Sequence, residues 1–535
     1  AKIKKELELY SDKLALKIRL VAANKMDLPE AADHLKRFKK KYKKEEVISV
    51  SAMENKGLNI FNAQYVLASP DTATDLDFQH IDSVVGHEYF HNWSGNRVTC
   101  RDWFQLSLKE GFTVFREQQF TQDITKSPVC RIDHVKLLMT RQFSEDAGPL
   151  AHSVRPDSYM EINNFYTMTI YEKGAEVIRM LHTLLGRKTF RAATDLYFSR
   201  HDGQAVTTDD FVAAMQDASG LDLTQFKLWY SQAGTPEVQV FEEYDAVNKI
   251  YILKLVQHTP PTPGQPIKQP LHIPIVVGLL DENGNDIPIE NTVLSFTQAE
   301  QSFKFANIAK KPYLSILRDF SAPVKIKHEV STDHLAFMLA HDSDDFNRWF
   351  AGQQLYMQNI KDLMQAKQQG QNLQLSEQSS ASFKAVLTDA KLNLALKAEL
   401  ICLPSTQQII DSLAVVDPDL IYAVKKFMVT TLAQMFSAEL LQAYTQHQLS
   451  GNYSYNANDM AFRNFKNIAL GYLLSNRTPE SLELAVKQYN NSNNMTDTMA
   501  ALANIVNIEC PQSTEILQGF YEKWQHNQLV TNKVN

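Results

Sequence analysis

Two histidines and a glutamate in the segment HEYFH (87–91) have the residue types and the spacing that could bind a metal ion. His87 and His91 are four residues apart, so on a helix both imidazoles lie on the same face. Zinc is commonly bound by two imidazoles and one carboxylate, with a fourth position left for water. Glu88 follows His87 directly and could accept a proton from that water. The segment therefore predicts one zinc ion per chain and a hydrolytic activity.

A carboxylate on the next helix should complete this zinc site. The segment LSLKEGFTVFREQQF (106–120) is typical of a helix, and it contains Glu110. We therefore expect Glu110 to be the third zinc ligand. An isolated HExxH pattern also occurs by chance on polar helices. Here the helical run DLDFQHIDSVVG (75–86), the helix end expected near Gly95 and the downstream glutamate favour the metal site.

The predicted secondary structure changes along the chain, and the zinc motif lies in a segment that is predicted to be helical. Residues 53–234 show amphipathic helical patterns, whereas residues 235–331 alternate apolar and polar residues as in a small β-sandwich. Residues 332–535 predict a series of helices that could stack as a solenoid. Residues 1–52 read as a short α/β fragment. The fold prediction is therefore a multidomain α+β protein with these four parts.

Local signals predict particular turns and helix starts within these parts. Asn283-Gly284 lies between two apolar runs and predicts a tight turn between two strands. Thr478 followed by Pro479 predicts a helix start, with threonine as the N-cap and proline in the first turn.

Composition and charge exclude several classes of protein. The 535 residues are 44% hydrophobic and 21% charged, which is typical of a globular chain, and a net charge of −7 gives no reason to expect a nucleic-acid partner. No stretch approaches the length of a membrane span, and the charged start lacks the apolar core of a signal peptide. Four scattered cysteines fit a reducing compartment. We expect a cytoplasmic monomer.

Four motifs make residues 53–535 resemble the M1 family of zinc aminopeptidases. They are AMENKG (52–57), HEYFHNW (87–93), LKEG (108–111) and YEKGAEV (171–177), and their order and spacing also match those of the family. The resemblance implies a thermolysin-like zinc domain. It also implies that the protein removes single N-terminal residues from peptides with a free N-terminus.

The resemblance also implies roles for residues outside the zinc site. The glutamate of the first motif binds the free α-amine of the peptide in this family, and that position is Glu54 here. Its neighbours Ala52, Met53 and Asn55 would then also lie along the bound peptide. The tyrosine of the last motif, Tyr171 here, would donate a hydrogen bond to the oxygen that gains charge in the transition state.

Both ends of the chain differ from the family pattern. The large N-terminal β-domain of the family is expected to be missing, and the helical part is expected to end early. Residues 1–52 instead resemble a fragment of an Obg-type GTPase, because they contain ANKMDLPEA (23–31), in which Asn24, Lys25 and Asp27 would contact a guanine base. The chain has no GxxxxGK[ST] loop to bind the phosphates. We therefore expect a chimeric chain that does not bind GTP.

Three alternatives to an active aminopeptidase stay open at this stage. The chain could be a truncated chimera that binds zinc but has little or no catalytic activity. It could be a zinc endopeptidase, in which case Glu54 would matter far less than in an aminopeptidase. A GTP-binding module is the third alternative, although the missing phosphate loop disfavours it.

Overall fold

The computed structural model describes residues 20–23, 46–49, 61–508 and 510–534. Within the first 52 residues it describes two strands, β1 (Leu20–Ala23) and β2 (Glu46–Ser49), which pair in parallel. Both strands lie inside segments whose sequence is typical of strands. The rest of the predicted GTPase-like fragment lies outside the described residues, and so does the predicted amine-binding segment with Ala52, Met53, Glu54 and Asn55.

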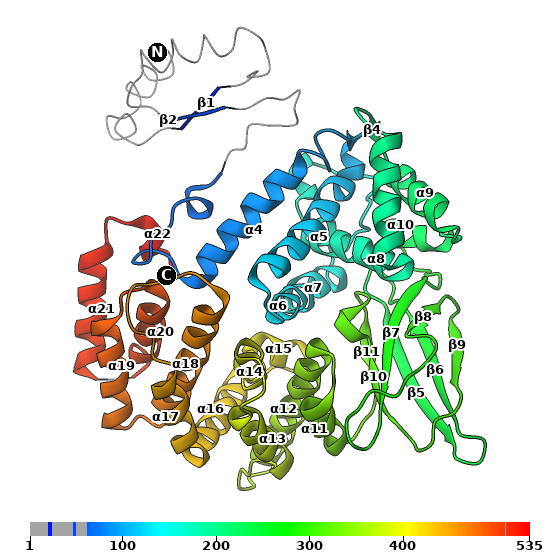
Figure 1. Cartoon of the computed structure of the whole chain (residues 1–535). Coiled ribbons are helices and arrows are strands. Elements are labelled where there is room, and N and C mark those ends of the chain that lie inside the picture. The colour runs from blue at the N-terminus through cyan, green and yellow to red at the C-terminus, as the bar shows by residue number, and fades with distance from the viewer. Residues whose placement is uncertain (1–19, 24–45, 50–60, 509, 535) are drawn as a thin grey trace.

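Three regions follow one another along the described chain, and Figure 1 shows that together they form a ring. A first helical region leads into two β-sheets, and a second helical region then returns to the start of the first one. The first region contains η1 (Ala63–Tyr65), α4 (Asp75–His91), β3 (Thr99–Cys100), η2 (Trp103–Gln105), α5 (Leu106–Thr125), α6 (Val129–Leu137), η3 (Leu138–Gln142), α7 (Phe143–Ala147), η4 (Ile162–Phe165), η5 (Thr169–Lys173), α8 (Gly174–Arg200), β4 (Ala205–Val206), α9 (Thr208–Ser219), η6 (Gln225–Lys227) and α10 (Leu228–Ser231).

Helix α4 has a strong start signal. The hydroxyl of Thr74 accepts a hydrogen bond from the Asp77 amide, and the Asp77 carboxylate accepts one from the Thr74 amide at 2.7 Å. This capping box satisfies amides that the first turn leaves unpaired. The helix ends at His91, before the expected stop at Gly95. Gly95 has a φ of +128°, and it takes part in the turn that leads from α4 to β3.

The middle region is a β-sandwich of two sheets. One sheet has the strand order β11-β5-β6-β9 and the other has the order β10-β7-β8. Buried residues alternate along β6, where Tyr251, Leu253 and Leu255 face the space between the sheets. The strands are β5 (Glu237–Asp245), β6 (Ile250–His258), β7 (Ile273–Leu280), β8 (Val293–Phe296), β9 (Glu300–Phe305), β10 (Tyr313–Ile316) and β11 (Lys325–Lys327), with η7 (Arg318–Phe320) between the last two.

The predicted turn at Asn283-Gly284 is present, but the second strand expected after it is not. The Gly284 amide donates to the Asp281 carbonyl at 3.0 Å, and Gly284 has a φ of +84° that favours glycine. After the turn, the chain makes only a single bridge to Leu280 before it leaves the sheet. β7 is instead paired with β8 on one side and β10 on the other, so no open edge remains for a longer hairpin.

The last region is entirely helical, and its helices pack in successive pairs. Helix α11 packs on α12, α17 on α18 and α19 on α20. The region contains α11 (Thr332–His341), α12 (Asp345–Gln368), α13 (Glu377–Thr388), α14 (Leu394–Leu400), α15 (Thr406–Asp411), α16 (Pro418–Met435), α17 (Ser437–Gln446), α18 (Ala457–Ser475), α19 (Pro479–Asn491), α20 (Met495–Ile505), α21 (Pro511–Trp524) and α22 (Gln528–Thr531). Throughout the described ranges, no helix is long and apolar enough to cross a membrane.

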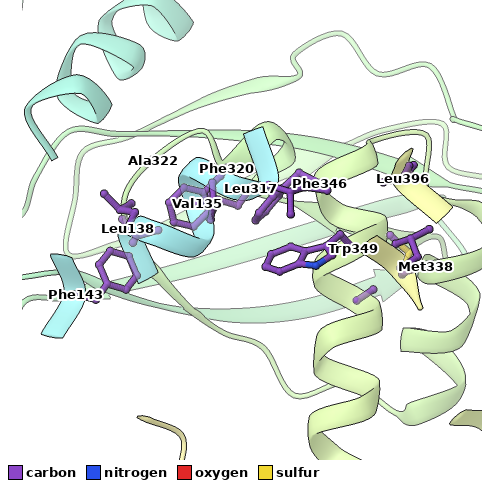
Figure 2. Close-up of a cluster of buried hydrophobic side chains, with 14 of the residues drawn as sticks. Val135, Leu138, Phe143, Leu317, Phe320, Ala322, Met338, Phe346, Trp349 and Leu396 are labelled. Atoms are coloured by element: carbon purple, nitrogen blue, oxygen red, sulfur yellow. The ribbon is translucent and has the colours of Figure 1, made fainter. Parts of the chain in front are cut away.

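One hydrophobic core connects the three regions. Figure 2 shows side chains from all three meeting at their junction, with Phe143 from the first region, Phe320 from the sandwich and Trp349 from the last region. Trp349 is 1% exposed and Phe320 is 2% exposed. Because these side chains bury apolar surface against one another, the three regions support one another rather than behaving as separate domains.

Candidate metal centre

His87, His91 and Glu110 come together between helices α4 and α5. The Nε2 atom of His91 lies 3.1 Å from Glu110 Oε2, and Nε2 of His87 lies 3.3 Å from the same oxygen. The candidate ligand atoms of all three residues lie within 4.8 Å of one another. His91 and Glu110 are buried, and the two imidazole rings meet edge to face. Two imidazole nitrogens and a carboxylate oxygen are a donor set that suits zinc.

The outward-facing nitrogen of each histidine has a hydrogen-bond acceptor. His87 Nδ1 donates to Glu117 Oε2 at 3.0 Å, and His91 Nδ1 donates to the Ser94 carbonyl at 3.0 Å. The Thr113 hydroxyl donates to the same carbonyl at 3.0 Å and braces this turn. A proton held on Nδ1 leaves the lone pair of each ring on Nε2, toward the centre of the group. This is the arrangement that metal-binding histidines generally show, and it fits a zinc ion held by these residues.

The pKa values in this group are set mainly by the two carboxylates, of Glu110 and Glu117, that lie beside the His87 imidazole. Burial alone would lower the pKa of His87, but its hydrogen bonds to Glu110 and Glu117 outweigh burial and raise that pKa to about 9. Burial opposes ionisation of Glu110, yet the hydrogen bonds to both histidines hold its pKa well below the usual range. Without a metal, His87 is therefore protonated on both ring nitrogens at neutral pH, and its positive charge balances the adjacent carboxylates. A metal cation bound at this position would balance the same negative charge.

Glu88 and Tyr171, the two predicted catalytic residues, are both close to this group. Glu88 follows His87 on α4 and is half-buried. Tyr171 lies on the π-helix η5, a kind of element that often occurs at functional sites. Burial first, and then the negative charges of Glu110 and Glu88, raise the pKa of Tyr171 far above its usual value. The phenol therefore keeps its proton at neutral pH and can act as a hydrogen-bond donor.

Two glycines from different motifs allow this arrangement. A Cβ atom on Gly111 would lie 2.7 Å from the carbonyl carbon of Gly174, and a Cβ on Gly174 would lie 2.2 Å from the Ser107 hydroxyl. Both distances are too short for real side chains, so the backbones of α5 and α8 approach closely only because neither position carries one. Gly111 follows Glu110, and Gly174 closes the π-helix that contains Tyr171. The close approach therefore brings the two candidate side chains, Glu110 and Tyr171, together.

Glu117 is a residue that the motif-based reasoning missed. It lies seven residues after Glu110, which is two helical turns, so both carboxylates lie on the same face of α5. A search for acidic residues at helical spacing from Glu110 would have found it. The next residue, Gln118, donates a side-chain hydrogen bond to the Glu172 carboxylate and accepts one from Arg179 at 2.6 Å. Burial, followed by the charge of Glu117, raises the pKa of Glu172 to about 7.

A large cavity lies elsewhere in the molecule. It has a volume of about 940 Å³ and lies at the junction of the three regions, where Phe143, Phe320 and Phe350 form part of its wall. None of the three candidate ligands lines it. The chemistry of the side chains, rather than the size of a cavity, therefore identifies the candidate centre.

Comparison with known families divides the chain into the same succession of folds. Residues 44–230 match the family described as the peptidase family M1 domain. Residues 234–329 match a domain of unknown function with an Ig-like fold, and residues 332–534 match a domain of unknown function with ARM repeats. The predicted fold class, a mainly helical peptidase region followed by a sandwich and a stacked helical region, is confirmed. The matches give no support to the prediction that residues 1–52 resemble an Obg-type GTPase.

Several individual proteins are similar over most of this chain. Aminopeptidase N of Escherichia coli (strain K12) is 48% identical over 494 residues, which cover 91% of this chain and 57% of the relative. Aminopeptidase N of Haemophilus influenzae is 44% identical, with coverage of 91% and 56%. The crystal structure of Legionella pneumophila aminopeptidase A in complex with aspartic acid superposes with a TM-score of 0.79 at 31% identity, covering 92% of this chain and 58% of that one. The chain thus spans little more than half the length of these relatives.

Proposed function

We propose that this chain acts as a zinc aminopeptidase that releases single N-terminal residues from peptides, because residues 44–230 match the peptidase family M1 domain. The observation that carries the proposal is the convergence of His87, His91 and Glu110, with Glu88 next to His87 in the chain. The identity of 48% to an aminopeptidase N supports it. The peptide substrates, the cytoplasmic location and the monomeric state stay predictions from the sequence.

His87, His91 and Glu110 would hold the zinc ion. When bound, zinc supplies a Lewis acid that lowers the pKa of water and polarises the peptide carbonyl. Glu88 accepts a proton from the attacking water and passes it to the departing amine. The Tyr171 phenol, which stays protonated at neutral pH, donates a hydrogen bond to the carbonyl oxygen as negative charge develops there.

Recognition of a free N-terminus is assigned to Glu54. Its carboxylate would pair with the α-ammonium group of the peptide, while Ala52, Met53 and Asn55 would lie along the first residue of the substrate. A carboxylate that requires one positive charge at the end of the substrate confines cleavage to the first peptide bond. Glu54 therefore separates an aminopeptidase from an endopeptidase with the same zinc chemistry.

The test combines metal content with turnover of the purified chain. Alanyl- and leucyl-p-nitroanilide should be hydrolysed, whereas their N-acetylated forms should not be, and one equivalent of zinc should be present. Equal hydrolysis of free and blocked substrates would contradict the proposal in favour of an endopeptidase.

Substitution of Glu88 tests its assigned role. Glu88→Gln removes the proton acceptor with little change in shape, so kcat should fall by about 10²–10⁴-fold while zinc stays bound. Glu243→Gln makes the same chemical change at an exposed position of the sandwich and should leave kcat unaltered. Retention of full activity by Glu88→Gln would remove Glu88 from the mechanism.

The second candidate is a zinc-binding protein without useful activity, and the identity of 48% to an aminopeptidase N does not favour it. Stoichiometric zinc without turnover of any free aminoacyl substrate would select this candidate. Brisk turnover would eliminate it.

A further inference from the structure

Helix α4 is held by different regions at its two ends. Of its 17 residues, Asp75, Ser83, Gly86 and His91 are buried. The C-terminal half packs on α5, where the Ser83 hydroxyl lies 2.8 Å from the Thr121 hydroxyl and Gly86 lies against the Phe120 ring. The N-terminal end has its buried contact with the last helical region instead, as Figure 1 shows where α4 reaches the C-terminal helices.

Asp75, the first residue of α4, forms hydrogen bonds with three residues that follow it in the chain by more than 370 positions. Its carboxylate accepts hydrogen bonds from Arg463 Nε at 2.7 Å and from a terminal guanidinium nitrogen at 2.9 Å. The Tyr453 hydroxyl donates to the same carboxylate at 2.8 Å, and the Asp75 amide donates to the Thr496 hydroxyl at 2.8 Å. Asp75 is 7% exposed and Arg463 is 2% exposed. Such a bidentate pair fixes both distance and direction.

Further contacts are made by other residues of the first turn of the helix. The Phe78 ring, one turn after Asp75, stacks on both Tyr453 and Tyr455, with centroid distances of 5.7 Å and 5.3 Å. Asp77 forms an ion pair with Lys533, in the last turn of the described chain. The helical region thus contacts the first turn of α4 through charges and through aromatic rings.

These contacts can control the position of the candidate metal ligands. Asp75 lies about 16 Å from Gly86 along the helix axis, and His91 lies about 7 Å beyond Gly86 on the other side. If α4 pivots where it packs on α5, a shift of about 1.5 Å at Asp75 moves His91 by roughly 0.7 Å. Functional side chains generally need to be held within about 0.5 Å of their working geometry. Small displacements at the Asp75 end are therefore large enough to matter.

We propose that Arg463 is a positioning residue, through which the helical region orients α4 and hence His87, Glu88 and His91. In this arrangement the last helical region contributes to catalysis indirectly, because it holds the N-terminal end of the helix that carries these side chains. The effect on catalysis rests on the proposed aminopeptidase function, whereas the effect on the orientation of α4 does not.

A matched pair of variants separates positioning from the general stability of the helical region. Arg463→Met removes the partner of Asp75. Lys466→Met removes a second buried cation from the same helix α18, whose partner Asp497 lies 2.8 Å away within the helical region. Both changes break a buried ion pair, but only the first one touches α4 directly.

The first measurement is amide hydrogen exchange of the metal-free chain, which does not depend on any activity. Arg463→Met should accelerate exchange in residues 75–91 by about tenfold or more, because the helix end loses its anchor, whereas Lys466→Met should leave that segment nearly unchanged. Arg463→Lys keeps the charge and should restore part of the protection. Equal exchange in α4 for the wild-type chain and Arg463→Met overturns the proposal, and so does equal acceleration by both methionine variants.

The second measurement is zinc affinity together with steady-state kinetics. Arg463→Met should weaken zinc binding and lower kcat by about tenfold, with KM changed by less than about threefold, because ligand placement rather than substrate contact is altered. If Arg463→Met does not fold, Tyr453→Phe removes a single hydrogen bond to Asp75 and should show the same pattern more weakly. Unchanged zinc affinity in a folded variant with accelerated exchange in α4 overturns the link between the anchor and the metal ligands. A wild-type chain with zinc but no turnover overturns only the proposed function.

Discussion

His87 lies between two carboxylates, Glu110 at its Nε2 and Glu117 at its Nδ1. This contact explains both the raised pKa of about 9 and the fit to a cation, because the same negative charge attracts either a proton or a metal ion. In the metal-free protein, the stability that His87 contributes is fully present below its usual pKa of 6.5. It is lost as the pH rises through about 9.

We predict that zinc binding becomes tighter as the pH rises from 6.5 to 9. A proton on His87 must leave before the imidazole can bind the metal, so the apparent affinity should increase by up to about tenfold per pH unit in this range. Competition with a chromophoric chelator at several pH values measures it. Glu117→Gln should move the dependence to lower pH, because it removes one of the two carboxylates that stabilise the protonated imidazole. An affinity that is constant between pH 7 and 9 would contradict the prediction.

At the scale of elements, the crossing of α5 and α8 places Glu110 beside Tyr171. The approach depends on Gly111 and Gly174, which come from motifs about sixty residues apart and leave no room for a side chain at either position. The HExxH helix α4, in contrast, packs on α5 along its C-terminal half and is anchored to the last helical region at its N-terminal end. The site thus combines one tightly packed crossing with one helix that is anchored from a distance.

We predict opposite effects for two glycine substitutions within helices. Gly111→Ala forces a methyl group against the Gly174 backbone and should lower the free energy of unfolding by about 1–3 kcal/mol. Gly519→Ala in α21 adds a methyl group with no heavy atom within 4 Å, so it should raise this free energy by roughly 0.5–1 kcal/mol through helix propensity. Urea denaturation of both variants is the measurement. A neutral or stabilising Gly111→Ala would refute the close-packing account.

At the scale of the whole molecule, the ring of three regions is closed by contacts of two kinds. The junction in Figure 2 is apolar, whereas the contact between α4 and the helical region is formed around the buried Asp75–Arg463 pair. Burial of apolar surface is non-directional, whereas a bidentate ion pair fixes direction. The two contacts therefore have different consequences for stability and for the candidate metal centre.

We predict that damage at the apolar junction spreads into all three regions. Phe320→Ala removes a ring that lies near Phe143 and Phe346, so it should cost about 3–5 kcal/mol and accelerate hydrogen exchange in α7 and α12 as well as in the sandwich. Phe296→Ala removes an equally buried ring inside the sandwich and should accelerate exchange in the strands alone. If the effect of Phe320→Ala is likewise confined to the strands, the three regions do not share a core.

Much of the fold could be predicted from the sequence, because its signals are local. The spacing of His87 and His91 predicted one face of a helix, alternating residues predicted strands β5 and β6, and Thr478 with Pro479 predicted the start of α19. The structure contains each of these elements. Hydrogen bonding, capping and burial periodicity act over a few residues, so the amino-acid order alone determines them.

Only the tertiary structure decided which distant residues meet. Helical spacing places Glu117 on the same face of α5 as Glu110, but only packing brings it to His87. Nothing in the local pattern indicates that Gly111 meets Gly174, or that Asp75 pairs with Arg463 nearly four hundred residues later. The absence of a strand after Asn283-Gly284 also results from tertiary packing, because β8 and β10, rather than the residues after the turn, pair with β7. Helix crossings and strand neighbours depend on the packing of the entire chain. Residue spacing therefore predicted the candidate ligands, whereas packing decided what surrounds and orients them.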